Sequence, residues 1–245
     1  MLAGVSGAAG RMGRFWDERA REDAFYFVDN LGGYRDGDTE RFWADGERAL
    51  DTLLGLLDLQ VRPGDAVVDV GCGVGRLTRV LAARAAGVDA IDVSAEMLGR
   101  AQELHASLDN VRWHLGDGTT LRPLADASAD AVVSHVVFQH IPDPAVTYRY
   151  VTEMGRVLRP GGWAAFQVSD DPSVHAGRPQ LRTRLGALVG RAPRGQEAPE
   201  WLGSAIDLAE LRRTADRAGL DVERVVGEGT QFCLVRARKR SGLSA

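Results

Sequence analysis

The stretch that decides the fold is residues 67–78, Val-Val-Asp-Val-Gly-Cys-Gly-Val-Gly-Arg-Leu-Thr. Its apolar start is typical of a buried parallel strand, and an apolar-periodic segment that predicts a helix follows it. Between them stand Gly71, Gly73 and Gly75, which let the backbone turn sharply and approach a ligand closely. A strand–loop–helix corner of this kind is the usual place for a nucleotide-like cofactor in an α/β protein.

The spacing of the glycines separates the candidate cofactors. A dinucleotide fingerprint, Gly-x-Gly-x-x-Gly, requires a glycine at position 76, where this chain has Arg76, so a nicotinamide oxidoreductase is disfavoured. The Gly-Lys-Ser/Thr of a phosphate-binding P-loop is absent from the sequence. With an aspartate two residues before the first glycine, the segment resembles the first motif of class I S-adenosylmethionine-dependent methyltransferases. The resemblance implies that the acidic residue and the loop lie beside the methionine moiety of the cofactor; the matching residues are Asp69, Gly71, Cys72, Gly73 and Gly75.

The composition is that of a soluble globular protein and argues against several other classes. The chain has 245 residues, 44% hydrophobic and 26% charged, and no apolar stretch approaches the roughly 18–20 residues of a membrane span. Its two cysteines, Cys72 and Cys233, are too few for a disulfide framework, a metal cluster or the iron–sulfur centre of radical chemistry. The net charge of −4 argues against general polyanion binding. We therefore expect a cytoplasmic monomer or homodimer that needs no metal and has no membrane or nucleic-acid partner.

Strand and helix patterns alternate along most of the chain. After residues 1–10, which we expect to be disordered, helices are predicted at 14–28 and 38–58. Strands are predicted at 66–70, 88–93, 111–115, 130–137 and 163–168, with helices at 74–86, 95–104 and 145–158. An insertion at 170–205, rich in Pro, Gly and Arg and carrying a short helix at 180–189, precedes a helix at 208–218 and strands at 220–226 and 230–237. Such alternation predicts a parallel sheet with helices on both faces.

The resemblance gives this pattern a definite architecture. It implies a Rossmann-like, seven-stranded, mostly parallel sheet whose last strand is antiparallel, in a three-layer α/β/α fold. We expect a helical cap or lid at residues 1–60, a methyltransferase domain at 61–240 with an acceptor-side insertion at about 170–205, and a tail at 241–245.

The end of the second predicted strand supplies the next part of the expected cofactor site. Asp92 stands there, where a carboxylate can accept hydrogen bonds from both ribose hydroxyls of a nucleotide. The resemblance implies that Val93 and Met97 flank the adenine ring.

Two later loops match the family as well. Gly116, Asp117 and Gly118 follow the third strand, and the resemblance implies that the aspartate accepts a hydrogen bond from the adenine amino group. Ser134 and His135 open the fourth motif, whose first residues border the methyl-donating sulfonium in the family.

Methyl transfer from a sulfonium asks little acid–base chemistry of the protein. The enzyme has to align an acceptor lone pair opposite the departing sulfur, and positioning of this sort can lower the barrier by about 7–11 kcal/mol. A general base matters only where the acceptor must lose a proton. His140 is the first candidate for that base, since its loop faces the acceptor in this fold, and His135 is the second. The alternative for His140 is a hydrogen bond within its own loop.

Acceptor selectivity is expected in the N-terminal helix and the insertion, because loops at the carboxyl edge of the sheet frame the ligand crevice. The candidate lid residues are Trp16, Phe25, Tyr26, His175 and Trp201. The alternative is that the aromatic residues merely pack the N-terminal helices on the core.

The sequence thus favours an enzyme that methylates a small organic acceptor at O, N or C and releases S-adenosylhomocysteine. Two alternatives stay open. One is methylation of RNA or protein, although Ser-His-Val-Val at residues 134–137 departs from the Asn/Asp/Ser-Pro-Pro-aromatic motif usual in base-amine methyltransferases. The other is a protein that binds the cofactor without transferring its methyl group.

Overall fold

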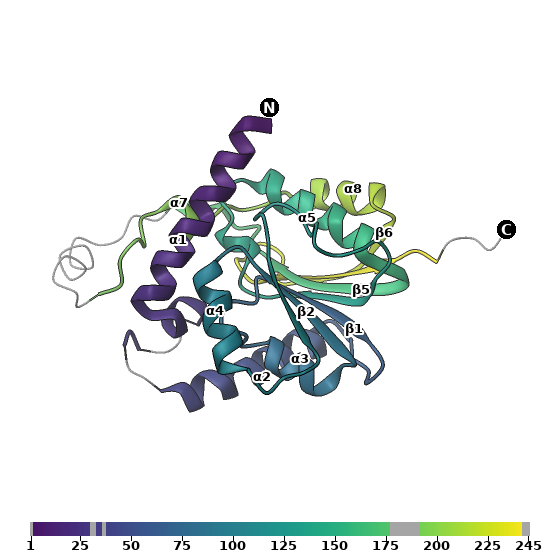
Figure 1. Ribbon diagram of the computed structural model, residues 1–245. Helices are drawn as coiled ribbons and strands as arrows, with labels where there is room; N and C mark the ends of the chain where they lie inside the picture. The colour runs from purple at the N-terminus through teal and green to yellow at the C-terminus, as the bar shows by residue number, and fades with distance from the viewer. Residues whose placement is uncertain (1, 30–32, 36–37, 177–191, 242–245) are drawn as a thin grey trace.

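The central element of the protein is a twisted sheet, seen in a computed structural model that describes residues 2–29, 33–35, 38–176 and 192–241. Over these residues seven strands pair in the order β3-β2-β1-β4-β5-β7-β6 (Figure 1). β7 runs antiparallel to β5 and β6, and the other neighbouring pairs are parallel. The strands are β1 (Ala66–Val70), β2 (Gly87–Asp92), β3 (Val111–Leu115), β4 (Ala129–Ser134), β5 (Leu158–Val168), β6 (Leu220–Val226) and β7 (Cys233–Lys239). The predicted Rossmann-like sheet with a reversed last strand is confirmed.

Helices form the layers on the two faces of this sheet (Figure 1). One face carries α2 (Thr39–Leu56), α3 (Thr78–Arg84) and α4 (Ala95–Leu104), and the other carries α5 (Pro144–Val157) and α8 (Leu208–Arg217). Short helices are η1 (Phe138–His140), η2 (Pro172–Ala176) and α7 (Pro199–Leu202). No described helix is both long and apolar enough to cross a bilayer.

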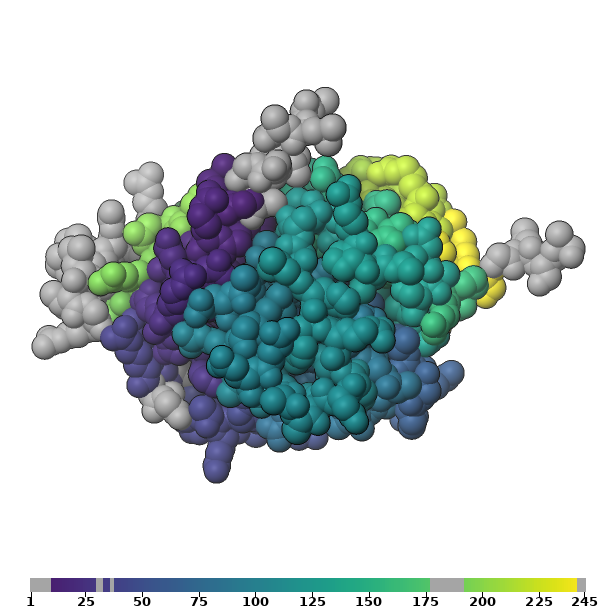
Figure 2. All heavy atoms as spheres, in the orientation of Figure 1, coloured from purple at the N-terminus to yellow at the C-terminus, as the bar shows by residue number. Residues whose placement is uncertain are grey.

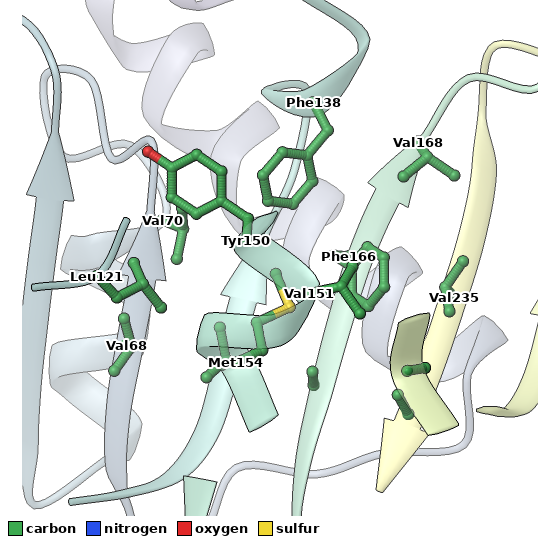
Figure 3. Close-up of a cluster of buried hydrophobic side chains, with 14 of the residues drawn as sticks. Val68, Val70, Leu121, Phe138, Tyr150, Val151, Met154, Phe166, Val168 and Val235 are labelled. Carbon is green, nitrogen blue, oxygen red and sulfur yellow. The ribbon is translucent and has the colours of Figure 1, made fainter. Parts of the chain in front are cut away.

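Strand alternation divides the core between the two faces. Val67 of β1 belongs to the cluster under α2 and α3, whereas Val68 and Val70 belong to the cluster under α5. Figure 3 shows the second cluster, in which Val151 and Met154 of α5 lie over the sheet, both fully buried. Because both faces are covered, β1 is apolar on both sides, apart from its carboxyl end, where Asp69 stands.

The N-terminal helix α1 (Leu2–Val28) lies across the carboxyl edge of the sheet and against α4, as the purple segment of Figures 1 and 2 shows. The carboxylate of Asp17 accepts hydrogen bonds from Ser94 Oγ (2.6 Å) and from the backbone N–H of Glu96 (3.0 Å), in the first turn of α4. An acidic side chain is favoured at this end of a helix because the first backbone N–H groups have no intrahelical partner. Asp23 interrupts α1 with extended backbone, and its carboxylate accepts from the N–H of Tyr26 (3.1 Å) to restart the helix.

Several predicted boundaries were wrong. Residues 2–10, predicted to be disordered, belong to α1, which begins at Leu2 and has no proline to interrupt its helical pattern. The helix after the glycine loop begins at Thr78, not at 74, because residues 74–77 form turns that carry the chain out of the loop. The first 60 residues also serve two purposes, since α1 crosses the sheet edge whereas α2 packs under the sheet through Leu50 and Leu53.

Several strands begin or end at residues other than those predicted from the sequence. The fourth strand ends at Ser134, not at 137, because Val136 has a φ of +59°, which no strand residue adopts. β5 begins at Leu158, before the predicted start at residue 163, with a shift of pairing register against β4. The last strand runs from Cys233 to Lys239, so its connection to β6 is longer than the predicted 227–229. The helix predicted at 180–189 lies outside the described residues.

Candidate functional site

A cavity of about 970 Å³, counting all space not filled by protein atoms, opens at the carboxyl ends of β1, β2 and β4. The strand order reverses between β1 and β4, and ligands of open α/β sheets bind at such a reversal. Ten predicted cofactor residues line the cavity: Asp69, Gly71, Cys72, Gly73, Asp92, Val93, Met97, Gly116, Gly118 and His135. The glycine loop, the end of β2 and the loop after β4 therefore meet around one space, as the sequence predicted.

The glycine loop is shaped by close neighbours at two of its positions. Gly71 has a φ of +75°, and a side chain there would collide with Val137 from the loop after β4. Gly73 has a φ of +54°, and an added Cβ would lie 2.8 Å from Val28 at the end of α1. Gly75 lies behind the cavity, where an added Cβ would meet the ring of His105. The first two glycines thus bring the loop against the walls of the cavity, and the third packs the loop on α4.

Asp92 ties the glycine loop to the start of α4. Its carboxylate accepts hydrogen bonds from the backbone N–H of Gly73 (2.8 Å) and of Ser94 (2.8 Å). Burial raises the pKa of this carboxyl, although the bonds to Ser94 and Gly73 oppose that rise. The same residue lines the cavity, so it can hold the loop in place and face a ligand.

Asp69 is the second carboxylate of the cavity and is 2% exposed. It accepts a hydrogen bond from Thr78 Oγ1 at 2.6 Å. Burial raises its pKa to about 6, against the opposing effect of the Thr78 bond and with further upward pressure from the charge of Asp92. A positively charged ligand would favour the ionised form of Asp69.

Two predicted cofactor residues, Asp117 and Ser134, do not line the cavity, and their side chains bond other groups of the protein. Asp117 turns its carboxylate onto its own loop, where it accepts from the N–H groups of Thr119 (2.8 Å) and Thr120 (2.7 Å). Ser134 is fully buried, and its hydroxyl donates to the carbonyl of Val70 at 2.9 Å, which joins β4 to β1. In this arrangement the glycines beside Asp117, and not its carboxylate, face the cavity.

Both candidate bases line the cavity. Burial lowers the pKa of His140 to about 4, against the opposing hydrogen bond to Trp201, and burial with the positive charge of Arg76 lowers that of His135 to about 4. Both imidazoles are therefore neutral at physiological pH. His140 Nδ1 lies 2.8 Å from the carbonyl oxygen of Trp201, and its Nε2 lies 3.2 Å from the side-chain nitrogen of Gln139.

The predicted lid residues divide into two groups. Trp16 lines the cavity, and the ring of Trp201 lies behind it, with centroids 5.3 Å from His140 and 6.4 Å from Trp16. Phe25 points away and packs on Phe42 at 4.8 Å, as the alternative of core packing predicted.

The remaining two lid candidates hold the chain instead of facing the cavity. Tyr26 accepts a hydrogen bond from Gln196. His175 bonds the carbonyl of Leu202 through Nδ1 and Ser169 Oγ through Nε2 (2.7 Å).

Sequence reasoning missed several residues of the cavity. Met12 and Val28 of α1 line it, as does Tyr150 of α5. The helical period of α1 could have pointed to Met12, which lies about one turn before Trp16 on the same face of the helix.

The most informative missed residue is Arg76. It lines the cavity with only 5% exposure, and its NH1 lies 2.9 Å from Asp29 Oδ2. Its Nε has no hydrogen-bond partner within the described part of the chain. The only use that sequence reasoning made of Arg76 was to exclude a dinucleotide site.

The charges of the cavity suit S-adenosylmethionine. Asp69 and Asp92 place two carboxyl groups on its wall, and the two lining histidines are neutral. Arg76 is paired with Asp29. The cofactor carries a sulfonium and an ammonium, and a wall with carboxyl groups suits these positive charges. In the described ranges, no group of three His, Cys, Asp or Glu side chains could hold a metal ion.

Comparisons with known proteins agree with this geometry. The family model described as "Methyltransferase domain" matches residues 68–166. A ubiquinone biosynthesis O-methyltransferase of Nitrosospira multiformis is 32% identical over 180 residues, which cover 71% of this chain and 70% of that protein. An uncharacterized 37.1 kDa protein in transposon TN4556 of Streptomyces fradiae is 34% identical over 171 residues, 69% of this chain but only 47% of that protein.

Among solved structures, an S-adenosylmethionine-dependent methyltransferase from Mesorhizobium loti superposes with a TM-score of 0.60 at 23% identity. The match covers 80% of this chain and 99% of that one, and at this identity it shows the fold alone. The relatives and the strand order together lead to one conclusion: the chain belongs to the class I S-adenosylmethionine-dependent methyltransferases.

Proposed function

We propose that this enzyme transfers the methyl group of S-adenosylmethionine to a small organic acceptor by in-line displacement and releases S-adenosylhomocysteine. The observation that supports the proposal is a group of three aromatic side chains at the cavity, which we call its roof. Trp16 and Phe27 of α1 line the cavity, and Trp201 of α7 packs against both rings. A site walled in this way suits a small, largely apolar molecule better than a polymer, because apolar and aromatic walls are typical of small-molecule pockets. The name of the Nitrosospira relative, an O-methyltransferase of ubiquinone biosynthesis, points to the same class of acceptor.

The roof is held by contacts between two distant parts of the chain. Arg19 NH1 donates to the carbonyl of Arg194 (3.1 Å), and the N–H of Arg194 donates to Glu22 (3.0 Å). These hydrogen bonds hold the segment that precedes α7 against α1. They support a closed site that excludes water from the reacting atoms.

From the residues that line the cavity we infer a place for each part of the cofactor. Asp92 would accept from the ribose hydroxyls, Val93 and Met97 would flank the adenine, and Asp69 would lie at the methionine end. When bound, the cofactor supplies an electrophilic methyl group on a sulfonium. The protein's own task is then to hold an acceptor atom in line with that methyl group and to keep the site dry.

His140 would accept a proton from an acceptor hydroxyl. The Trp201 carbonyl can only accept a hydrogen bond, so Nδ1 of the neutral ring carries the proton and Nε2 keeps a lone pair. Gln139 donates to that lone pair at 3.2 Å, a long bond that an acceptor hydroxyl can replace. His135, the second candidate base, has no hydrogen bond within the described ranges that would fix its tautomer.

A two-stage experiment tests the proposal. Calorimetry should show binding of S-adenosylhomocysteine by the purified protein and none of NAD. Transfer of a labelled methyl group should then be measured to a panel of small phenols, alcohols and amines, and in parallel to total RNA and to bulk protein. Label in a small hydroxylated product supports the proposal, and label only in RNA or protein contradicts it. Cofactor binding with no transfer to any of these would identify a binding protein instead.

A further inference from the structure

Two polar atoms on the wall of the cavity are buried without a partner. In the described part of the chain, four buried side-chain atoms have no hydrogen-bond partner, and Arg76 Nε and His135 Nδ1 are the two that belong to cavity-lining residues. The other two belong to Arg19 and Thr147. Native proteins leave few buried polar groups unpaired, because each unmade hydrogen bond costs the full desolvation of the group. Two such atoms on one cavity point to a ligand group that pairs with them.

The guanidinium of Arg76 is held so that its Nε edge stays free. Its NH1 pairs with Asp29 Oδ2 at 2.9 Å, and the two side chains are 5% and 8% exposed. Its stem passes so close to α2 that a Cβ added at Gly46 would lie 2.6 Å from Arg76 Cγ. The side chain therefore has no room to swing into solvent. A buried guanidinium whose Nε–H group has no partner in the protein can bind an anionic group of a ligand.

The imidazole of His135 complements this cation. It follows the last residue of β4 and lines the same cavity. Burial and the charge of Arg76 hold its pKa at about 4, so the ring is neutral and has one proton to donate. A neutral donor beside a buried arginine can bind a carboxylate without placing two positive charges together.

Asp69 adds an acceptor to these two donors. Its buried carboxylate lines the cavity and interacts with the charge of Arg76. An anion-binding pair next to a carboxylate is the arrangement that recognises an α-amino acid, whose carboxylate needs donors and whose ammonium needs an acceptor.

We propose that Arg76 Nε and His135 Nδ1 bind the carboxylate of the methionine moiety of the cofactor. This inference rests on the proposed function, since it assumes that S-adenosylmethionine occupies the cavity. It assigns Arg76 a ligand that the glycine-loop motif by itself does not.

The test compares two ligands that differ in the amino acid. S-adenosylhomocysteine carries the carboxylate, whereas 5′-methylthioadenosine keeps the adenosine and the thioether sulfur and lacks the carboxylate and the ammonium. Their dissociation constants are measured by calorimetry with the wild type, with Arg76→Met, and with Arg76→Met combined with Asp29→Asn, which removes both charges of the Arg76–Asp29 pair.

We expect both Arg76 variants to bind S-adenosylhomocysteine about 10–100-fold more weakly, the usual effect of losing a charged hydrogen bond, and to bind 5′-methylthioadenosine within about twofold of the wild type. Arg79→Met is the matched control, because Arg79 is an exposed arginine that lies over the Trp43 ring. It should change neither dissociation constant.

A second measurement follows His135 itself. Its imidazole pKa, read by nuclear magnetic resonance, should rise when S-adenosylhomocysteine binds and stay unchanged with 5′-methylthioadenosine, because only the first ligand brings a carboxylate to the ring. His135→Gln, which keeps a donor, should retain more affinity for S-adenosylhomocysteine than His135→Leu.

Equal losses for the two ligands in the Arg76 variants would overturn the proposal, because a purely structural arginine affects both. Unchanged affinity for S-adenosylhomocysteine would overturn it too, and a raised acceptor KM in that case would move the anion site to the acceptor. Failure of the proposed function is distinguishable, since the wild type would then bind neither ligand.

Discussion

The Nδ1 atom of His140 lies 2.8 Å from the backbone carbonyl oxygen of Trp201. This bond links the loop after β4 to the end of α7, and it fixes which ring nitrogen carries the proton. The candidate base is therefore oriented by a segment that lies 61 positions further along the chain.

Replacing His140 by Phe should separate acid–base chemistry from packing. The phenyl ring keeps the contacts with Trp16 and Trp201 but has no nitrogen. For a hydroxyl acceptor we expect kcat to fall by about 10²–10⁴, with the dissociation constant of S-adenosylhomocysteine unchanged. His175→Phe is the matched control, because His175 also bonds a carbonyl of α7, that of Leu202. Equal losses of kcat in both variants would mean that the histidines only hold α7.

His140 should also make the protein sensitive to acid. Its pKa of about 4 in the folded state lies below the ordinary 6.5, because burial disfavours the imidazolium. Between pH 6.5 and pH 4 the unfolded chain binds a proton at this residue, whereas the folded chain does not. The free energy of unfolding therefore keeps its full value above pH 6.5 and decreases as the pH falls towards 4. Denaturant titrations should show a smaller loss of unfolding free energy on acidification in His140→Phe than in the wild type. At pH 4.5 the two losses should differ by about 2–3 kcal/mol. Parallel curves for the two proteins would contradict this.

Asp69 should give cofactor binding a pH dependence of its own. Its pKa of about 6 in the free protein means that it is largely protonated at pH 5, and the ammonium group of the ligand's amino acid prefers the ionised form. Affinity for S-adenosylhomocysteine should therefore fall about tenfold between pH 7 and pH 5 in the wild type. Asp69→Asn should bind more weakly at pH 7 and show no such fall. A variant that keeps the wild-type pH dependence would assign the titration to another group.

Asp92→Ala should weaken binding of the cofactor at least tenfold, because it removes the expected ribose acceptor and frees the N–H groups of Gly73 and Ser94. Asp89→Ala is the control on the same strand, since Asp89 pairs with Arg112 of β3 (2.6 Å) and is not among the residues that line the cavity. Calorimetry with S-adenosylhomocysteine compares the two. Similar affinities in both folded variants would contradict the assignment of Asp92.

Gln167 should be needed to hold the loop after β4. It is 1% exposed; its Oε1 accepts from the N–H of Val136 (3.3 Å), and its Nε2 donates to Gln139 Oε1 (2.6 Å) and to the carbonyl of Gln231 (2.9 Å). Val136 has a φ of +59°, which a β-branched residue adopts only when its surroundings impose it.

Gln167→Leu leaves these groups unpaired and should lower the free energy of unfolding by about 1–3 kcal/mol, with a loss of kcat greater than the loss of cofactor affinity. Gln231→Ala keeps the backbone carbonyl and is the control, expected within about 0.5 kcal/mol of the wild type. Chemical denaturation and steady-state kinetics measure both effects. If Gln167→Leu keeps wild-type stability and kcat, the network has no such role.

Local patterns in the chain were enough to predict the sheet and most of the residues at the carboxyl edge that line its cavity. The apolar run before Gly71 and the carboxylate at the end of β2 are both readable one segment at a time, and parallel strands bring their carboxyl ends to one edge whatever the details. Ser94 likewise caps α4 as its residue type predicted, with the N–H of Met97 donating to its hydroxyl at 3.1 Å.

Tertiary structure alone decided which side chains face the cavity and in which chemical state. Phe25 and Phe27 lie two positions apart in one helix and therefore point to opposite sides, the first packed on Phe42 and the second lining the cavity. The packing of α1 on the sheet decides which of the two faces the cavity. The pairing of Arg76 with Asp29 and the tautomer of His140 depend on contacts across 47 and 61 positions of the chain. Burial and long-range hydrogen bonds set a side chain's direction and its pKa, and neither is encoded in the spacing of neighbouring residues.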